Sequence, residues 1–282
     1  MMQREFMKKT NNKCRLCKSE NLKIIKKERE FRLMKCNDCG IIFLDPFPNH
    51  FKLRRMYSID KTKNFEYYKL SEPLDKISFD SELKIITKHI PKKNGKIKIL
   101  DYGCSNGTFM EVAREHGFEV EGREINKNSI KTSRHKGFIV NSNHKNFDIV
   151  TAHELIEHLS DPIKFINEVK NLLKKNGLPI ISTPDFDKSI VRATQIKPDE
   201  HLYYFKKEVL KKILEKNGFQ VLYMKNISRK RSVRALLYST TSKKKQIKKL
   251  LKLICFLKLE SATNFLLSHL KINILVIAKR IV

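Results

Sequence analysis

Four cysteines close to the start of the chain are spaced as two pairs of metal ligands. Cys14 and Cys17 enclose two residues, and eighteen residues later Cys36 and Cys39 repeat the pattern. Each pair offers two thiolates from one tight turn, and the two pairs together complete a tetrahedral sulfur cage for Zn²⁺. Disulfide bonds fit poorly with first residues that lack an apolar signal segment, and a redox CxxC motif occurs once rather than twice. Because all four ligand positions are filled, the sequence predicts a closed, structural zinc site.

A second group of candidate residues lies in a glycine-bearing turn after a predicted strand at residues 97–100. Asp101 begins this turn, and Gly103 and Gly107 are its glycines. Gly103 lets the backbone approach a ligand closely, and Gly107 lets the next helix begin near the sheet. Glu124 follows at the end of the next predicted strand, where a carboxylate can bind both hydroxyls of a ribose.

The composition of this turn disfavours a dinucleotide. The phosphate-binding pattern GxGxxG is incomplete, because Ser105 and Thr108 occupy its second and third glycine positions. The acid at the head of the turn, Asp101, would also repel a pyrophosphate. A cationic sulfonium ligand with an amino-acid end therefore fits the turn better.

Two other motifs imitate catalytic signatures. Residues 103–107 spell GxSxG, the nucleophile elbow of α/β-hydrolases, but that elbow sits on a later strand of its fold. His153 and His158 resemble a zinc-protease HExxH pair, yet they are five residues apart and do not share a helix face. We interpret Glu157 and His158 as a helix-entry motif that closes the cofactor pocket.

Strands and helices alternate regularly from residue 96 onward. Strands are predicted at 97–100, 118–122, 138–140, 147–152, 178–182, 219–224 and 272–278, and helices at 108–116, 126–136, 163–174 and 206–217. This alternation predicts an α/β fold with a Rossmann-like, doubly wound sheet of seven strands. We divide the chain into a zinc ribbon at 1–48, a helical connector at 49–95 with a helix over 76–90, and the sheet domain at 96–282.

An ordered series of short motifs resembles class I S-adenosylmethionine (SAM)-dependent methyltransferases, in particular bacterial members with an N-terminal zinc ribbon. The matching segments are 99–107, 121–124, 147–150, 157–162, 182–184, 200–205 and 216–219. The resemblance covers roughly residues 96–224 together with the cysteine pairs. It implies SAM as cofactor and methyl transfer as the reaction.

The resemblance also assigns roles to individual positions. It places Asp101, Gly103, Cys104 and Gly107 at the methionine end of the cofactor, Glu124 at the ribose, and Ala152 and His153 beneath the transferred methyl group. The chain departs from the family at Ser105, which replaces the usual middle glycine. It departs again at 141–146, which lacks the acid often found near the adenine, and Asn141, Ser142 or Asn143 are the candidate substitutes.

Methyl transfer from a sulfonium needs mainly in-line positioning, and a base where the acceptor must lose a proton. His153 and His201 are the candidates for that base, with Tyr203 behind them. The alternative role for His201 is to cap or orient a loop.

The acceptor is a separate question. Relatives with a ribbon commonly act on sugars or sugar nucleotides, so we expect O-methylation of a sugar or glycan intermediate in surface polysaccharide or natural-product biosynthesis. The longer C-terminal half of the sugar C-methyltransferases is missing here, which favours O-methylation. RNA and quinone-like lipids are alternative acceptors, and a non-catalytic zinc-ribbon protein that binds nucleic acid is the alternative of another class. The interleaved aromatic and basic pattern that stacks bases is missing, which argues against nucleic acid.

The charge balance is strongly basic, with 59 Lys and Arg against 30 Asp and Glu among 282 residues, a net charge of +29. Evenly spread lysine is the background of an AT-rich genome. From Lys216 to the last residue, however, sixteen basic residues face the single acid Glu260, which suggests a nearby anionic surface. No stretch reaches the ~18 apolar residues of a membrane span. We therefore expect a cytoplasmic protein, with contact to the inner membrane face as an option.

The most basic segment, residues 243–258, predicts an amphipathic helix. Its apolar face holds Ile247, Leu250, Leu251, Ile254 and Leu257, and its basic side holds Lys244, Lys245, Lys248, Lys249 and Lys252. Two placements stay open. The helix packs on the sheet as the crossover to the last strand, or it lies on an anionic bilayer surface.

Overall fold

The computed structural model describes residues 7–8, 12–28, 30–48, 62–91, 95–230, 232–233 and 245–281. The chain forms two compact units, and each unit is assembled from separate stretches of sequence. The first contains residues 1–59, 143–225 and 274–282, and the second contains residues 60–142 and 226–273.

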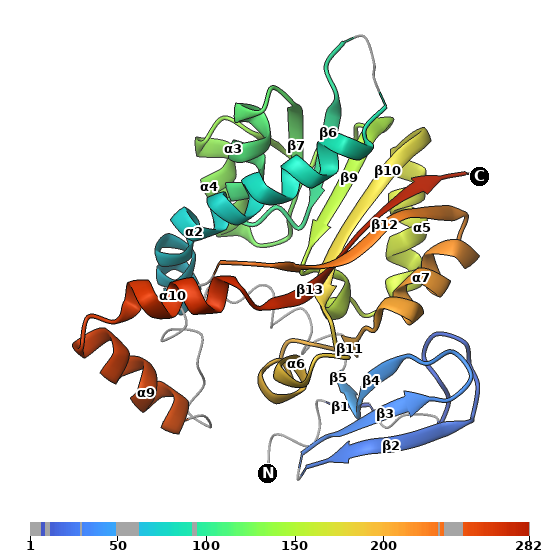
Figure 1. The fold of residues 1–282 in the computed structure, drawn as a ribbon. Helices are drawn as coiled ribbons and strands as arrows, with labels where there is room; N and C mark the ends of the chain where they lie inside the picture. The colour runs from blue at the N-terminus through green and yellow to red at the C-terminus, as the bar shows by residue number, and fades with distance from the viewer. Residues whose placement is uncertain are drawn as a thin grey trace. The chain divides into compact units, whose positions relative to one another are not determined.

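Seven strands form one sheet in the order β12-β13-β10-β9-β6-β7-β8 (Figure 1). Their bounds are β6 (Lys98–Tyr102), β7 (Glu119–Arg123), β8 (Ile139–Val140), β9 (Phe147–His153), β10 (Leu173–Pro184), β12 (Phe219–Ser228) and β13 (Lys271–Arg280). The pairs β6–β7, β7–β8 and β9–β10 are parallel, as crossover helices require. The predicted α/β fold with a seven-stranded sheet is confirmed.

In the second unit, α3 (Thr108–Glu115) connects β6 to β7, and α4 (Lys127–His135) connects β7 to β8. Met110 of α3 packs with Cys104, Phe138 and Val140 in a buried apolar cluster. Helix α2 (Thr62–Ile86) packs against α3, followed by the short helix η1 (Thr87–His89). Helix α2 begins at Thr62, well before residue 76, where the sequence predicted the start of a helix. The unit also contains α9 (Lys245–Phe256) and α10 (Glu260–Ser268).

In the first unit, α5 (Pro162–Leu172) packs against β9 and β10. Asp161 caps this helix by accepting a hydrogen bond from the Lys164 amide, and Pro162 occupies its first turn. Strand β10 starts directly after the helix, earlier than the predicted residue 178, and its register shifts between Leu173 and Leu178. Helices η2 (Ile156–His158), α6 (Ser189–Thr194) and α7 (Lys207–Lys216) complete the unit. In the described part of the chain, no helix combines the length and apolar character needed to cross a bilayer.

The N-terminal segment forms an antiparallel sheet in the order β11-β4-β3-β2, with β2 (Leu22–Lys27), β3 (Arg32–Cys36), β4 (Ile42–Asp45) and β11 (Tyr203–Tyr204). A separate pair joins β1 (Met7–Lys8) to β5 (Phe47–Pro48). Strand β11 comes from much later in the chain and was not predicted. Tyr203 pairs with Phe43, and the Leu44 amide donates to the Leu202 carbonyl over 2.9 Å. The ribbon sheet is therefore completed by the segment that carries His201.

Candidate functional site

The glycine turn predicted to bind a cofactor is closed by backbone hydrogen bonds to the neighbouring strand. The amides of Gly103 and Cys104 both donate to the Arg123 carbonyl, over 2.8 and 3.0 Å. Gly107 precedes the first residue of α3 with φ at +81°, in the left-handed region that favours glycine. A Cβ at that position would lie 3.1 Å from the Ser133 hydroxyl. The turn thus needs glycine at 107 for its conformation.

Glu124 ties this turn to the end of β7. One carboxylate oxygen accepts a hydrogen bond from the Ser105 amide over 3.0 Å. The other accepts from the amides of Ile125 and Asn126, over 2.7 and 2.8 Å. A carboxylate has about four acceptor positions. These three hydrogen bonds fix the direction of the carboxylate, and about one acceptor position is left for a ribose hydroxyl.

Asn141, a predicted substitute near the adenine, contacts the backbone of Glu124. Its Oδ1 accepts from the Glu124 amide over 2.9 Å, and its Nδ2 donates to the Glu124 carbonyl over 2.8 Å. Ser142 donates to the Glu121 carboxylate over 2.5 Å. Asn141 therefore positions the strand end that carries Glu124.

The electrostatic character of the turn is acidic. Asp101 is buried at the end of β6, in register with Gly122 of β7. Burial raises the pKa of the Cys104 thiol, and the charges of Asp101 and Glu124 raise it further. Cys104 therefore remains a neutral thiol, and the two carboxylates favour a cationic ligand.

The predicted cofactor residues divide between the two units. Asp101, Gly103, Cys104, Gly107 and Glu124 lie together in the second unit. Ala152 and His153 lie at the carboxyl end of β9 in the first unit, where His153 is in register with Ser182 of β10. The roles of all seven residues remain predictions.

The first unit holds a cluster of three side chains, the buried Glu157 and His201 and the partly buried His158. The imidazole rings of His158 and His201 meet edge to face, with centroids 4.8 Å apart. His158 Nδ1 donates to the Glu200 carbonyl, and His201 Nδ1 donates to the Gln195 carbonyl, each over 2.9 Å. Since Nδ1 carries the proton in each neutral ring, Nε2 of each ring is a lone-pair acceptor.

Glu157 completes this cluster. One of its carboxyl oxygens accepts from the Thr183 hydroxyl over 2.9 Å. The other, Oε1, is 4.0 Å from His158 Nε2 and accepts no hydrogen bond from any residue that the structure describes. One ligand atom from each of Glu157, His158 and His201 lies within 4.8 Å of the others. Such a set can accept a proton or coordinate a divalent cation.

Burial determines the charges of this cluster. It raises the pKa of Glu157 to about 8, and the nearby charge of Glu154 acts in the same direction. Burial lowers the pKa of His158, and it lowers the pKa of His201 well below its usual value. Near neutral pH the carboxyl group is therefore mostly protonated and both imidazoles are neutral.

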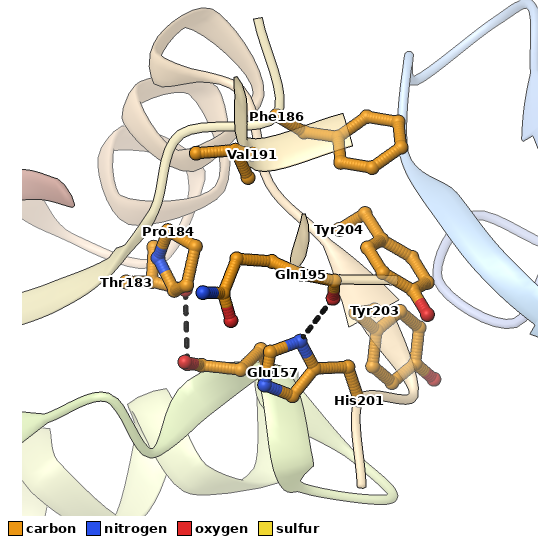
Figure 2. Close-up of a pocket in the computed structure, with 9 residues that line it drawn as sticks. All are labelled: Glu157, Thr183, Pro184, Phe186, Val191, Gln195, His201, Tyr203 and Tyr204. Atoms are coloured by element: carbon orange, nitrogen blue, oxygen red, sulfur yellow. Dashed lines mark hydrogen bonds between the residues drawn. The ribbon is translucent and has the colours of Figure 1, made fainter. Parts of the chain in front are cut away.

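Figure 2 shows a small pocket beside this cluster. It is lined by Glu157, Thr183, Pro184, Phe186, Val191, Gln195, His201, Tyr203 and Tyr204. The Tyr203 hydroxyl donates to the Ser160 carbonyl over 3.2 Å, and burial raises its pKa, so Tyr203 is held as a neutral donor. His201 lines the pocket, and its role as a base stays a prediction. Glu157 and His158 were predicted only as a helix entry. Tyr204 and Gln195 were not among the predicted site residues, because no recognised spacing marks them.

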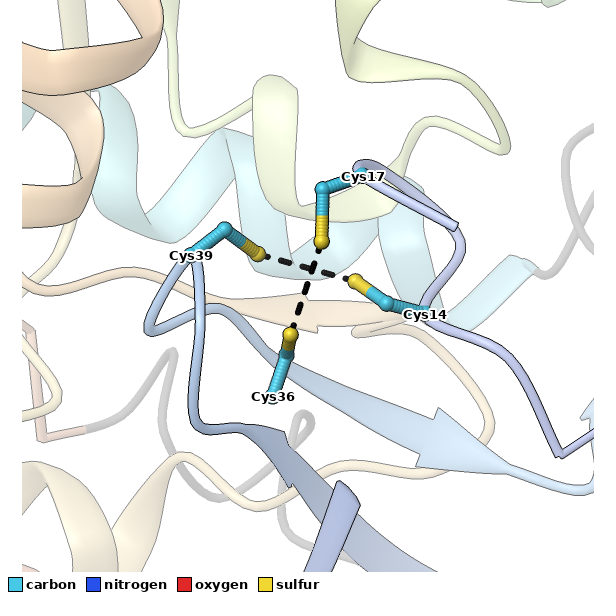
Figure 3. A group of neighbouring side chains, drawn as sticks. All are labelled: Cys14, Cys17, Cys36 and Cys39. Carbon is cyan, nitrogen blue, oxygen red and sulfur yellow. Dashed lines mark hydrogen bonds between the residues drawn. The ribbon is translucent and has the colours of Figure 1, made fainter. Parts of the chain in front are cut away.

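The four N-terminal cysteines converge as predicted (Figure 3). The sulfurs of Cys14 and Cys39 are 3.6 Å apart, and those of Cys17 and Cys36 are 3.5 Å apart. A tetrahedral zinc with Zn–S bonds of about 2.3 Å places its sulfurs about 3.8 Å apart, so the geometry fits structural zinc. The hydrogen bond from Cys39 lowers the pKa of Cys14 to about 5 and raises that of Cys39, so the pair shares one proton.

The cysteine cluster and the pocket are connected through the ribbon sheet. Gly40, with φ at +78°, follows Cys39, and its amide donates to the Cys36 carbonyl over 2.9 Å. Strand β4 follows this turn and pairs with β11. Because β11 carries Tyr203 and Tyr204, the ribbon holds one wall of the pocket.

The sheet carries an acidic glycine turn after β6 and a fixed carboxylate after β7. These features are typical of α/β proteins that bind a nucleoside-containing cofactor such as SAM. Residues 68–224 match the family model described as a methyltransferase domain. The chain therefore belongs to the methyltransferase domain family.

Solved structures support the fold. A SAM-dependent methyltransferase from Archaeoglobus fulgidus superposes with a TM-score of 0.50 at 21% identity, over 76% of this chain and 99% of that one. A Bacillus halodurans protein described as a methyltransferase superposes with a TM-score of 0.51 at 19% identity, over 71% of this chain and 99% of that one.

Curated relatives match a shorter segment. The ubiquinone biosynthesis O-methyltransferase of Pelagibacter ubique is 33% identical over 115 residues, which is 36% of this chain and 47% of that protein. The protein of the same name from Ruegeria sp. is 30% identical over 101 residues, which is 31% of this chain and 41% of that protein. The chain thus spans about half or less of the length of these relatives.

Proposed function

We propose that this protein is a SAM-dependent O-methyltransferase whose acceptor is a phenolic hydroxyl of a quinone-like lipid. The single observation that carries the proposal is the acidic glycine turn, in which the carboxylate of Glu124 is held by three backbone amides. Membership of the methyltransferase domain family supports it.

The residues present fit the cofactor. Asp101 and Glu124 supply the negative charge that a sulfonium and an ammonium group require, and a pyrophosphate would be repelled there. Gly103 leaves the backbone of the turn open to close approach. When bound, SAM supplies an activated methyl group, so this chain's residues need only orient the acceptor and take up its proton.

His201 is our candidate to accept that proton. Its Nδ1 donates to the Gln195 carbonyl, so its Nε2 is the basic atom. Burial lowers the pKa of the ring, which keeps it neutral at rest and makes it a weak base. A phenolic proton would move to Nε2 as the phenolic oxygen bonds to the methyl carbon and the bond from that carbon to the sulfonium sulfur breaks, which would leave neutral S-adenosylhomocysteine. The second imidazole, His158, is in contact with His201 and fixes its orientation.

The acceptor class is proposed from the relatives. The buried rings of Phe186, Tyr203 and Tyr204 lie around His201 and leave room there for little more than a water molecule. The names of the Pelagibacter and Ruegeria relatives point to the same acceptor class. They lend no support to the predicted sugar or glycan acceptor or to polysaccharide biosynthesis.

A transfer assay with labelled SAM tests the proposal. We expect the zinc-loaded protein to methylate a demethylated ubiquinone precursor that has a free ring hydroxyl, and His201→Gln to reduce the rate while leaving cofactor affinity unchanged. Glu115→Gln on the exposed surface of α3 is the matched control and should transfer at the wild-type rate. Transfer to sugar nucleotides but not to the phenol would reject the acceptor class. Salt-sensitive RNA binding without any cofactor affinity would support the non-catalytic alternative.

A further inference from the structure

Exposed apolar side chains are concentrated on α9 and the turn that follows it. Leu253 and Phe256 are 50% and 83% exposed. The same stretch adds further large apolar residues with about half of their surface exposed, namely Leu250, Leu257 and Leu259. Single exposed leucines are ordinary on protein surfaces, but five such residues within ten positions form a patch.

The patch has the geometry of an amphipathic helix. Leu250, Leu253 and Leu257 follow one another at helical spacing and share a face. Exposed lysines flank it at 249, 252 and 258. Between residues 245 and 259 the chain has five lysines and no acid. This surface therefore combines exposed apolar side chains with positive charge that no acidic residue of the segment offsets.

The exposure of the helix bears on the two placements predicted for it. Packing on the sheet would bury Leu250 and Leu257, yet both are about half exposed. Ile247, Leu251 and the lysines at 244, 245 and 248 lie outside the residues whose side chains the structure describes. Helix α10 is anchored, because its Asn264 side chain accepts from the amide of the buried Val233 over 2.9 Å. On the described part of the apolar face, Leu250 and Leu257 are about half exposed and Ile254 is partly buried.

We infer that α9 and the following turn, residues 249–259, form a docking surface for anionic phospholipid bilayers. The charge selects the partner: lysines attract an anionic headgroup layer, and leucines and Phe256 enter the boundary between headgroups and acyl chains. The proposed quinone-like acceptor resides in such a bilayer, so the inference rests on the proposed function for the purpose of the docking surface. The exposure and charge of α9 that carry the inference do not depend on that function. Vesicle binding is measured without cofactor or acceptor, so either proposal can fail alone.

The test is co-sedimentation of the full, zinc-loaded chain with vesicles at low salt. We expect binding to mixed phosphatidylglycerol and phosphatidylcholine vesicles and little binding to pure phosphatidylcholine. The charge variant Lys249→Glu, Lys252→Glu, Lys258→Glu should lower the partition coefficient by at least about tenfold. The apolar variant Leu253→Ser, Phe256→Ser should also lower it by about tenfold.

A matched control makes the same charge change elsewhere. Lys131→Glu, Lys175→Glu and Lys212→Glu alter three exposed lysines outside the patch and should leave binding within about twofold of wild type. Circular dichroism and the bound zinc content check that each variant is folded. Failure to bind anionic vesicles, equal binding to neutral vesicles, or binding by either patch variant at the wild-type level would overturn the inference. A control variant that loses binding to the same extent would overturn it as well.

Discussion

Replacing Glu157 with glutamine should change how the stability of the protein depends on pH. Glu157 is 1% exposed, and burial raises its pKa from 4.5 to about 8. Among the charged groups around it, Glu154 raises the pKa and Lys197 lowers it, while Thr183 donates to the carboxyl group. Glutamine keeps the size of the side chain and an oxygen for Thr183, but it stays neutral at every pH.

The sign follows from proton linkage. Between pH 4.5 and 8 the folded protein holds a proton on Glu157 that the unfolded chain has released, so its stability falls as pH rises through this window. With these two pKa values and about 1.4 kcal/mol for each pH unit, the loss is below about 1 kcal/mol at pH 5 and about 3 kcal/mol at pH 7. The loss approaches an upper limit of about 5 kcal/mol above pH 8.

Urea unfolding of wild type and Glu157→Gln at pH 5 and pH 7 measures this effect. The stability of the variant relative to wild type should increase by roughly 2 kcal/mol between the two pH values. Zinc binding also depends on pH, but it does so equally in both proteins and cancels in the difference. The exposed Glu115→Gln control should show no such increase. A difference for Glu157→Gln that is constant or smaller at pH 7 would refute the argument that burial keeps this carboxyl group protonated.

Three further changes test other parts of the structure. Gly122→Ala would place a Cβ 2.5 Å from the Cys104 sulfur, and we expect it to lower the free energy of unfolding by about 1–3 kcal/mol in denaturant titrations; an unchanged value would mean that the turn can move aside. Cys36→Ser removes one of four thiolates and should reduce bound zinc, measured by atomic emission, together with the near-ultraviolet signal of Tyr203 and Tyr204 on β11; full zinc retention would reject the four-cysteine site. His201→Gln should lower the rate of methyl transfer by about 10²–10⁴-fold, and a wild-type rate across pH 6 to 9 would show that His201 is not the base.

Sequence patterns predicted the parts of the molecule that depend on short-range geometry. The two CxxC pairs lie on tight turns whose backbone brings each pair of sulfurs together, so their spacing alone indicated the cluster. The glycine turn and Glu124 end adjacent parallel strands, and the register of Asp101 with Gly122 brings them close. Whether these residues bind the cofactor is still a prediction.

Contacts between residues far apart in the chain could not be predicted from the sequence. Strand β11 has two residues, too few for any hydrophobic period, and it pairs with β4 from a distant part of the chain. The early start of α2 was hidden by Pro73, which usually ends or begins a helix but here lies within one. The cluster of Glu157, His158 and His201 joins two adjacent residues to a third more than forty positions later, and spacing along the chain does not reveal this contact.

Titration calorimetry with S-adenosylhomocysteine tests the central claim most directly. For the zinc-loaded wild type we predict saturable binding of one molecule per chain, and Glu124→Gln should weaken it by at least about tenfold because an ionic acceptor for the ribose is lost. Glu115→Gln should bind as tightly as wild type. The account would be contradicted by a folded, zinc-loaded protein that releases no heat and shows no binding, or by Glu124→Gln binding with undiminished affinity.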